Sequence, residues 1–81
     1  MATYILTCDH EASECAAIEE ELQRLGPAEV IQGRDFYCSC PYGKHAGWVA
    51  VEAENAESVL ASLPPVFRTH AQVHQVETVR F

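Results

Sequence analysis

Thiols and imidazoles are the side chains of this sequence that are best suited to chemistry, because the chain contains four cysteines and four histidines. Thiolate and imidazole are the ligands that zinc, nickel and copper take in proteins. One short pair is Cys8-x-His10, a second is Cys38-x-Cys40, and His45 follows in a glycine-containing loop. The candidate metal ligands are therefore Cys8, His10, Cys38, Cys40 and His45, and the candidate cofactor is a transition metal, either zinc or nickel.

The same cysteines have a structural interpretation. Structural zinc sites usually place about two to four residues between paired cysteines, whereas a single residue separates Cys38 from Cys40. Cysteine is also one of the most frequently buried residue types, so Cys8 and Cys38 can be core residues. Cys15 falls on the apolar stripe of a predicted helix, and we expect it in the core.

A second set of residues could support catalysis or ligand binding on an uncovered face of the sheet. His45 and Glu52 are the candidate proton-transfer groups. The candidate ligand-binding residues combine an apolar wall with polar side chains: Trp48, Tyr37, Tyr42, His74 and Arg68. The structural alternative is that Trp48 and Glu52 belong to an interface, and that Arg68 binds a carboxylate or helix carbonyls.

Length and charge exclude several classes of protein. A chain of 81 residues fits one domain spanning residues 1–81. The net charge is −7 and the five basic residues are scattered, which argues against nucleic acid and anionic membranes as partners. No apolar run approaches the ~20 residues that span a bilayer. The N-terminus is predicted to be a strand without a preceding basic region, so we expect no signal peptide, a cytoplasmic location and reduced thiols.

Hydrophobic periodicity and turn residues predict six elements. Strands are expected at residues 2–8, at 28–32 continuing through 36–40, at 48–54 and at 71–81. Helices are expected after Asp9, ending at Gly26-Pro27, and after Asn55, ending at Pro64-Pro65. The segment at residues 66–68 is expected to form a short turn packed on the core.

This order is the split β-α-β pattern and predicts an α+β, ferredoxin-like βαββαβ sandwich. Right-handed crossovers would give a four-stranded antiparallel sheet of order 4-1-3-2 with two helices on one face. In that topology, the ends of the first two strands and the starts of the last two share one edge. We therefore expect that edge to gather His10, His45, His70, His74, Cys8, Cys38 and Cys40.

The other face of this sheet has no helix to cover it. It is expected to carry Trp48, Ala50 and Glu52 from the third strand, with Thr3, Ile5 and Thr7 from the first. An exposed tryptophan beside an isoleucine suggests that this face is covered. A second copy of the chain is the simplest cover, which predicts a homodimer or a higher homo-oligomer.

Several residues carry a resemblance to a known group of proteins. They are Cys38 or Cys40 before a glycine-containing turn, then Gly43, His45, Trp48 and Glu52, then Pro64-Pro65-x-x-Arg68. In these residues the chain resembles short uncharacterised proteins of the dimeric α+β-barrel, ferredoxin-like superfamily. That superfamily includes muconolactone isomerases, antibiotic-biosynthesis monooxygenases and small nickel-binding proteins. The resemblance implies the fold and a homo-oligomer more than it implies an activity.

Three functions remain open at this point. The first is a small homo-oligomeric binding protein that holds a small molecule or a transition metal at the His/Cys-rich edge of the sheet. The second is a small cofactorless enzyme of the isomerase or monooxygenase kind. The third is a structural or interaction protein.

Overall fold

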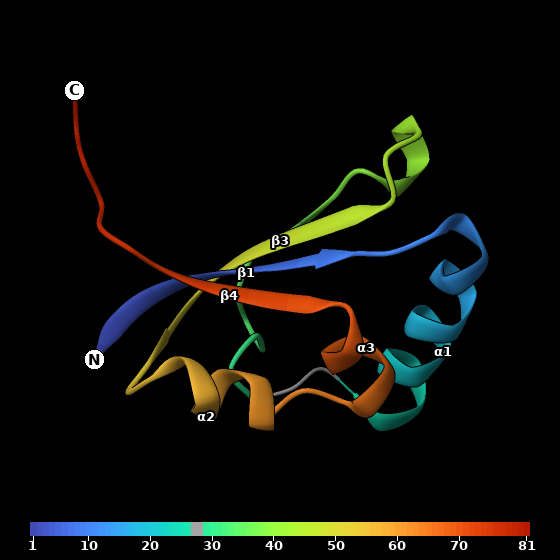
Figure 1. The fold of residues 1–81 in the computed structure, drawn as a ribbon, viewed down its shortest axis with the longest axis horizontal. Helices are drawn as coiled ribbons and strands as arrows, with labels where there is room; N and C mark the ends of the chain where they lie inside the picture. The colour runs from blue at the N-terminus through green and yellow to red at the C-terminus, as the bar shows by residue number, and fades with distance from the viewer. Residues whose placement is uncertain (27–28) are drawn as a thin grey trace.

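The computed structural model describes residues 1–26 and 29–81, and within them it has a four-stranded antiparallel sheet and three α-helices (Figure 1). The predicted α+β class is therefore confirmed. The strands are β1 (Ala2–Asp9), β2 (Phe36–Cys38), β3 (Ala46–Ala53) and β4 (Ala71–Val76). The helices are α1 (Cys15–Leu25), α2 (Ala56–Ala61) and α3 (Pro65–Thr69). Two short 3₁₀ turns complete the elements, η1 (Ala12–Glu14) and η2 (Cys40–Tyr42).

The order across the sheet is β2-β3-β1-β4, or β4-β1-β3-β2 when counted from the other edge. Each neighbouring pair is antiparallel, so β1 and β2 run one way and β3 and β4 run the other. The finer assignment as a ferredoxin-like sandwich with two helices is not confirmed. Residues 65–69 form a third helix where a short turn was expected, and β2 has only three residues.

Two predicted strands are shorter in the structure than in the sequence interpretation. Residues 29–32 form turns and not a strand, while Ala28, at the start of that predicted strand, and Pro27, expected to end the first helix, lie outside the described residues. Gly33 has a φ of 78°, a left-handed conformation that interrupts an extended chain. The last strand ends at Val76, so residues 77–81 do not extend the sheet as expected.

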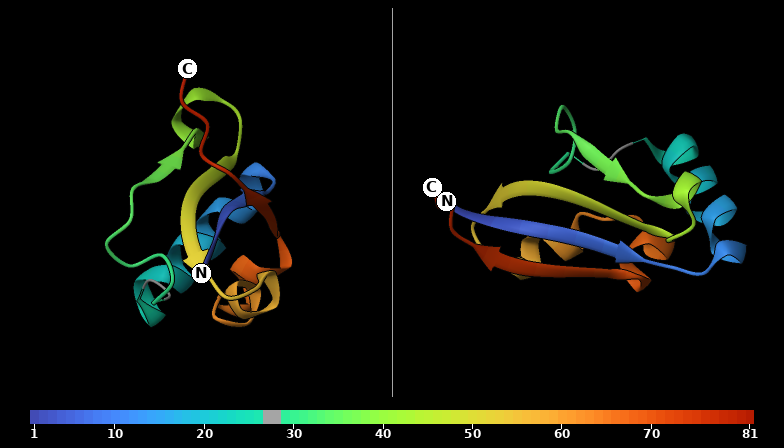
Figure 2. Two further views of the ribbon diagram at one scale, coloured as in Figure 1. Left: turned by 90° about the vertical axis from the view of Figure 1, so that its left-hand side faces the viewer. Right: turned by 90° about the horizontal axis from the view of Figure 1, so that it is seen from above.

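The core lies between one face of the sheet and the helices. Alternate residues of β1 are buried, namely Tyr4, Leu6 and Cys8, because successive side chains of a strand point to opposite faces. They pack in one cluster with Val51 of β3 and Phe67 of α3. The helices lie on this side of the sheet (Figure 2). None of the helices in residues 1–26 and 29–81 is long and apolar enough to cross a membrane.

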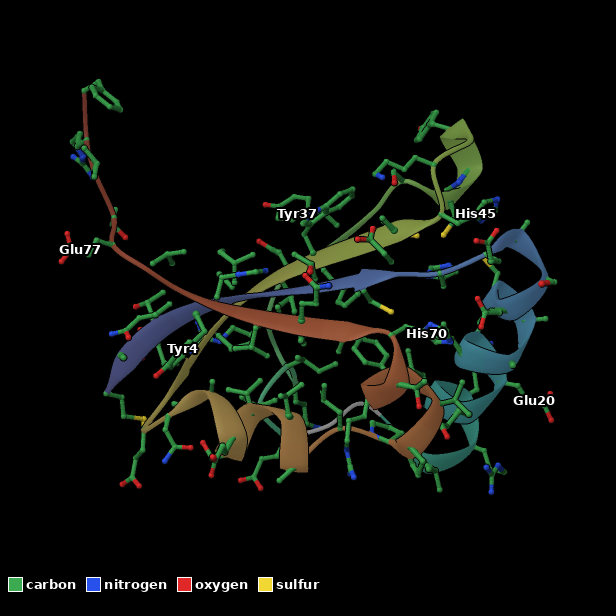
Figure 3. The ribbon with its side chains drawn as sticks, viewed as in Figure 1. Tyr4, Glu20, Tyr37, His45, His70 and Glu77 are labelled. Atoms are coloured by element: carbon green, nitrogen blue, oxygen red, sulfur yellow. The ribbon has the colours of Figure 1, made fainter. Side chains whose placement is uncertain are left out.

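The opposite face of the sheet is open, as the alternation predicts. Trp48 pairs with Thr7 of β1 and with Tyr37 of β2, so these side chains share that face. Tyr37 is 65% exposed and lies on the opposite side of the sheet from Tyr4 (Figure 3). Covering of this face by a second copy stays a prediction, which sedimentation equilibrium of the purified chain would contradict by giving a monomer at all concentrations.

The buried carboxylate of Glu21 fixes α1 against α3. Glu21 is 5% exposed, and its two oxygens accept hydrogen bonds from the backbone N–H groups of Val66, at 3.1 Å, and Phe67, at 3.0 Å. These N–H groups belong to the first turn of α3 and have no partner within that helix. The α1 side chain therefore caps α3, and the pair positions the helix layer beneath the site.

Replacing Glu21 by alanine should lower the free energy of unfolding by about 2–4 kcal/mol, because the buried N–H of Phe67 and the part-buried N–H of Val66 lose a charged acceptor. Glu20→Ala, an exposed neighbour on the same helix, is the matched control and should change the stability by less than about 0.5 kcal/mol. Urea unfolding of both variants measures the difference. Equal midpoints for the two variants would contradict the capping role of Glu21.

Candidate metal centre

The register of β1 and β3 brings two histidines together. The ladder runs from Ala2 opposite Ala53 to Asp9 opposite Ala46. Continued by one residue, this register places His10 opposite His45, and the backbone N–H of His10 donates to the carbonyl oxygen of His45 at 3.1 Å. The two imidazole rings pack edge to face with centroids 5.9 Å apart. The end of one strand pair therefore fixes both residues.

Each chain segment that leaves this histidine pair forms a short 3₁₀ turn and provides a cysteine. On one side, η1 lies between His10 and Cys15, the first residue of α1. On the other side, η2 begins at Cys40 and is followed by His45. Four residues separate histidine from cysteine in both segments. The sequence thus provides two arms of equal length in opposite chain direction, His-x₄-Cys and Cys-x₄-His.

Hydrogen bonds in both arms hold these side chains in place. In the first arm, the backbone N–H of Glu11 donates to the carboxylate of Glu14 at 2.8 Å, which closes η1. In the second arm, Gly43 takes a φ of 105° and its N–H bonds to the carbonyl oxygen of Cys40 at 3.3 Å. A residue with a Cβ would be strained at that φ. The turn at Gly43 therefore directs the chain back toward His45.

The four side chains meet at one point, and we call them the His₂Cys₂ cluster: His10, Cys15, Cys40 and His45. Their ligand atoms lie within 4.8 Å of one another, and all four residues are half-buried. The Sγ of Cys15 lies 2.9 Å from Nε2 of His10, 2.9 Å from Nδ1 of His45 and 3.6 Å from Sγ of Cys40. The Sγ of Cys40 lies 3.4 Å from Nε2 of His10. These four residues are positioned to bind a metal ion.

The donor set and its spacing fit a tetrahedral ion. Bonds of about 2.3 Å to sulfur and about 2.0 Å to nitrogen imply separations of about 3.8 Å between two sulfurs and about 3.5 Å between sulfur and nitrogen. The sulfur atoms of Cys15 and Cys40 are already 3.6 Å apart. The two shortest sulfur–nitrogen separations, both 2.9 Å, need to widen by about 0.6 Å. Side-chain rotation can provide that movement at a half-buried position.

The structure brings together three of the five predicted metal ligands, His10, Cys40 and His45, and replaces the other two with one that was missed. Cys15 was expected in the core, and that expectation is wrong, because Cys15 is half-buried and lies in the cluster. Cys8 and Cys38 are not members of the cluster. The signal that could have revealed Cys15 is the equal spacing of the two His/Cys arms.

Cys8 has a different position, beneath the cluster. It is 2% exposed, and its Sγ lies 3.9 Å from Nδ1 of His10, the nitrogen that does not face the cluster. Burial raises the pKa of the Cys8 thiol from 9.0 to about 11, with a smaller contribution from the carboxylate of Asp9. A neutral thiol at this position can accept a hydrogen bond from His10 and orient its ring, as outer partners of metal-binding histidines do.

The two candidate catalytic residues lie at opposite ends of β3, so they cannot form one acid–base site. His45 directly precedes the strand, whereas Glu52 is its seventh residue and pairs with Thr3. Seven residues of extended chain span about 23 Å. Glu52 instead forms an exposed ion pair with Arg34 at 3.9 Å on the open side of the sheet.

The candidate ligand-binding residues do not converge on one point. Tyr37 and Trp48 are cross-strand neighbours on the open face, while the adjacent η2 turn carries Tyr42, which is 89% exposed. His74 was expected at the edge with the other histidines, and this is wrong: it pairs with Ile5 in the middle of β4. The guanidinium of Arg68 donates to the carbonyl oxygens of Leu63, at 2.6 Å, and Ala61, at 3.2 Å. It therefore caps the C-terminal end of α2.

His70 does reach the expected edge, and Figure 3 shows it at the same end of the sheet as His45. Its Nε2 lies 2.7 Å from the carboxylate of Glu14, the residue before Cys15. A polar pocket of about 420 Å³ adjoins His10 and His45 on this side and is also lined by Asp9, Glu11 and Lys44. The cluster is therefore reached from solvent through acidic surroundings, which attract cations.

Comparisons with known proteins do not assign a function to this site. Comparison with protein-family models, with curated proteins and with solved structures found no match. The resemblance to dimeric α+β-barrel proteins therefore stays a prediction, and the site has to be interpreted from its own residues.

Cys8 and Cys38 should differ in how fast their thiols react with a maleimide. At pH 7, a maleimide should label the exposed Cys38 well before the buried Cys8, as mass spectrometry of timed samples will measure. Because the pKa of Cys8 is higher in the folded chain, its contribution to stability is complete below pH 9 and is lost as the pH rises toward about 11. Wild type should therefore lose more stability than Cys8→Ala over that range. Equal labelling of both thiols at pH 7 would contradict this assignment.

Proposed function

We propose that this protein binds one zinc ion per chain through His10, Cys15, Cys40 and His45. The observation that carries the proposal is the convergence of two imidazole nitrogens and two thiol sulfurs within 4.8 Å. Two cysteines and two histidines are a frequent ligand set of structural zinc sites. The two arms come from distant parts of the chain, so their meeting follows from the fold and not from a local motif.

Zinc fits this donor set better than nickel, copper, calcium or magnesium does. A closed N₂S₂ set with separations near those of a tetrahedron favours zinc, while nickel(II) and copper(II) prefer planar or tetragonal arrangements. Calcium and magnesium take oxygen ligands, and the cluster has none. A zinc ion here would be four-coordinate with protein ligands alone.

The bound ion would act as a cross-link. It would join the segment between β1 and α1 to the loop between β2 and β3, two segments that also meet through the His10–His45 backbone hydrogen bond at 3.1 Å and the exposed Lys44–Asp9 ion pair at 4.0 Å. Domains of this size bury a modest core and often need a metal or a disulfide for stability. In this proposal, zinc orders the edge of the sheet and stabilises the fold.

A catalytic role for the ion is less well supported. Catalytic zinc sites usually have three protein ligands and leave one position open for water or substrate. The cluster supplies four ligands. For the cofactorless-enzyme alternative, His45 and Glu52 lie at opposite ends of β3, so each would have to act as a proton-transfer group without the other.

The test is the zinc content of tag-free protein purified without chelator, measured by elemental mass spectrometry. Wild type should contain close to one zinc per chain. The double variant Cys40→Ser, His45→Ala should retain less than about a tenth of that amount, because two of four ligands are gone. Zinc should also raise the unfolding temperature of wild type. At a free zinc concentration of about a hundred times the dissociation constant, binding should add about 2.7 kcal/mol to the free energy of unfolding.

The matched control makes the same two types of substitution outside the cluster, in Cys38→Ser, His74→Ala. Both residues are exposed, so this variant should fold and bind zinc like wild type. Substoichiometric zinc in wild type after incubation with excess ion would contradict the proposal. So would equal loss of zinc in the two double variants, since that would assign the binding to thiols and imidazoles in general.

A further inference from the structure

All four cysteines of the chain line one pocket. This pocket has a volume of about 410 Å³ and lies between α1 and β2, with apolar walls from Ile18, Leu22, Phe36 and Phe67. His10 of the cluster also borders it. Small solutes that enter from solvent therefore reach several thiols at the same place, and the geometry decides which of them can react with one another.

Cys15 and Cys40 are the pair that is ready to react. Their sulfur atoms lie 3.6 Å apart, and both residues are half-buried. A disulfide bond of about 2.05 Å would require them to approach by about 1.5 Å. Rotation about the side-chain bonds can supply most of that distance, because the two residues lie on separate segments and Cys40 is in a short turn next to exposed Pro41.

The other two thiols are poorly placed for this reaction. Cys8 is 2% exposed, so a solute has little access to its sulfur. Cys38 is exposed, but only one residue, Ser39, separates it from Cys40 in the sequence. The N–H of Ser39 bonds to the carbonyl oxygen of Ala46 at 3.0 Å, and its hydroxyl bonds to that of Lys44. These bonds resist the backbone change that a disulfide between Cys38 and Cys40 would need.

We propose that Cys15 and Cys40 are an oxidation site at which a peroxide converts the metal ligands into a disulfide and expels the metal. This inference rests on the proposed zinc site. One thiolate attacks a peroxide oxygen, the O–O bond breaks, and a sulfenic acid forms with release of hydroxide. The second thiolate attacks that sulfur, the S–S bond forms and a second hydroxide leaves. Two protons from solvent complete the balance: Zn(S–Cys)₂ + H₂O₂ + 2 H⁺ gives Zn²⁺, the disulfide and two waters.

The reaction exchanges one cross-link for another. The disulfide removes both sulfur ligands, so His10 and His45 alone remain to hold the ion. The same two segments, the β1–α1 connection and the β2–β3 loop, stay joined covalently through Cys15 and Cys40. The chain should therefore release zinc without unfolding, and reduction should restore the site.

The experiment treats zinc-loaded, reduced protein with hydrogen peroxide and follows two signals. A chromogenic chelator should record release of about one zinc per chain, and non-reducing peptide mapping should find Cys15 joined to Cys40. Cleavage after Glu11 and Glu14 separates Cys8 from Cys15. Cys38 and Cys40 fall in the same peptide, so a Cys38→Ser variant shows which of the two forms the disulfide. This variant should give the same disulfide and the same release of zinc. Reduction with a phosphine should restore zinc binding, and circular dichroism should keep its folded signature throughout.

Other outcomes would overturn the inference. A disulfide that includes Cys8 or Cys38 in wild type, or zinc release that accompanies sulfinic acids without a disulfide, would show that Cys15 and Cys40 are not the reacting pair. Retention of zinc after the disulfide has formed would show that oxidation does not control the metal. If the protein never holds zinc, the proposed function fails, and peptide mapping of the metal-free chain still decides the pairing.

Discussion

The antiparallel register of β1 with β3 is the constraint on which the site depends. Every pair in this ladder is fixed by which face of each strand is buried, since a slip of one residue would turn Leu6 and Val51 out of the core. The same register makes His10 and His45 the next pair beyond the ladder. Packing at the centre of the sheet therefore determines the distance between two imidazoles at its edge.

The positions of Cys15 and Cys40 depend on the same strand register. Each lies five residues from its histidine in sequence, Cys15 directly after η1 and Cys40 as the first residue of η2, so the two cysteines are equally far from the end of the ladder along the chain. The buried carboxylate of Glu21 holds α1 against α3, which fixes the helix that begins at Cys15. Core burial, one buried cap and two short turns thus bring four donor atoms together from two segments that are 25 residues apart in the sequence.

The sequence predicts the strands better than it predicts the site. Alternation and turn residues predict β1, β3 and the Asn55 cap of α2, whose side chain accepts from the N–H of Ser58 at 2.8 Å. They fail at residues 29–32, where Ile31 is buried without joining a strand, because burial alone does not distinguish a packed turn from a strand. At the site, His10, Cys40 and His45 follow from the expected topology. Cys15 was missed because its spacing to Ile18 and Leu22 also fits a core stripe.

X-ray absorption at the zinc edge of the loaded protein measures directly whether two sulfurs and two nitrogens hold one tetrahedral ion. Binding by the His₂Cys₂ cluster predicts two sulfur ligands at about 2.3 Å and two nitrogen ligands at about 2.0 Å. A shell made mainly of oxygen and nitrogen, or one with three or four sulfurs, would contradict it. The first result would place the ion on the surface carboxylates, and the second would move it toward Cys8 and Cys38.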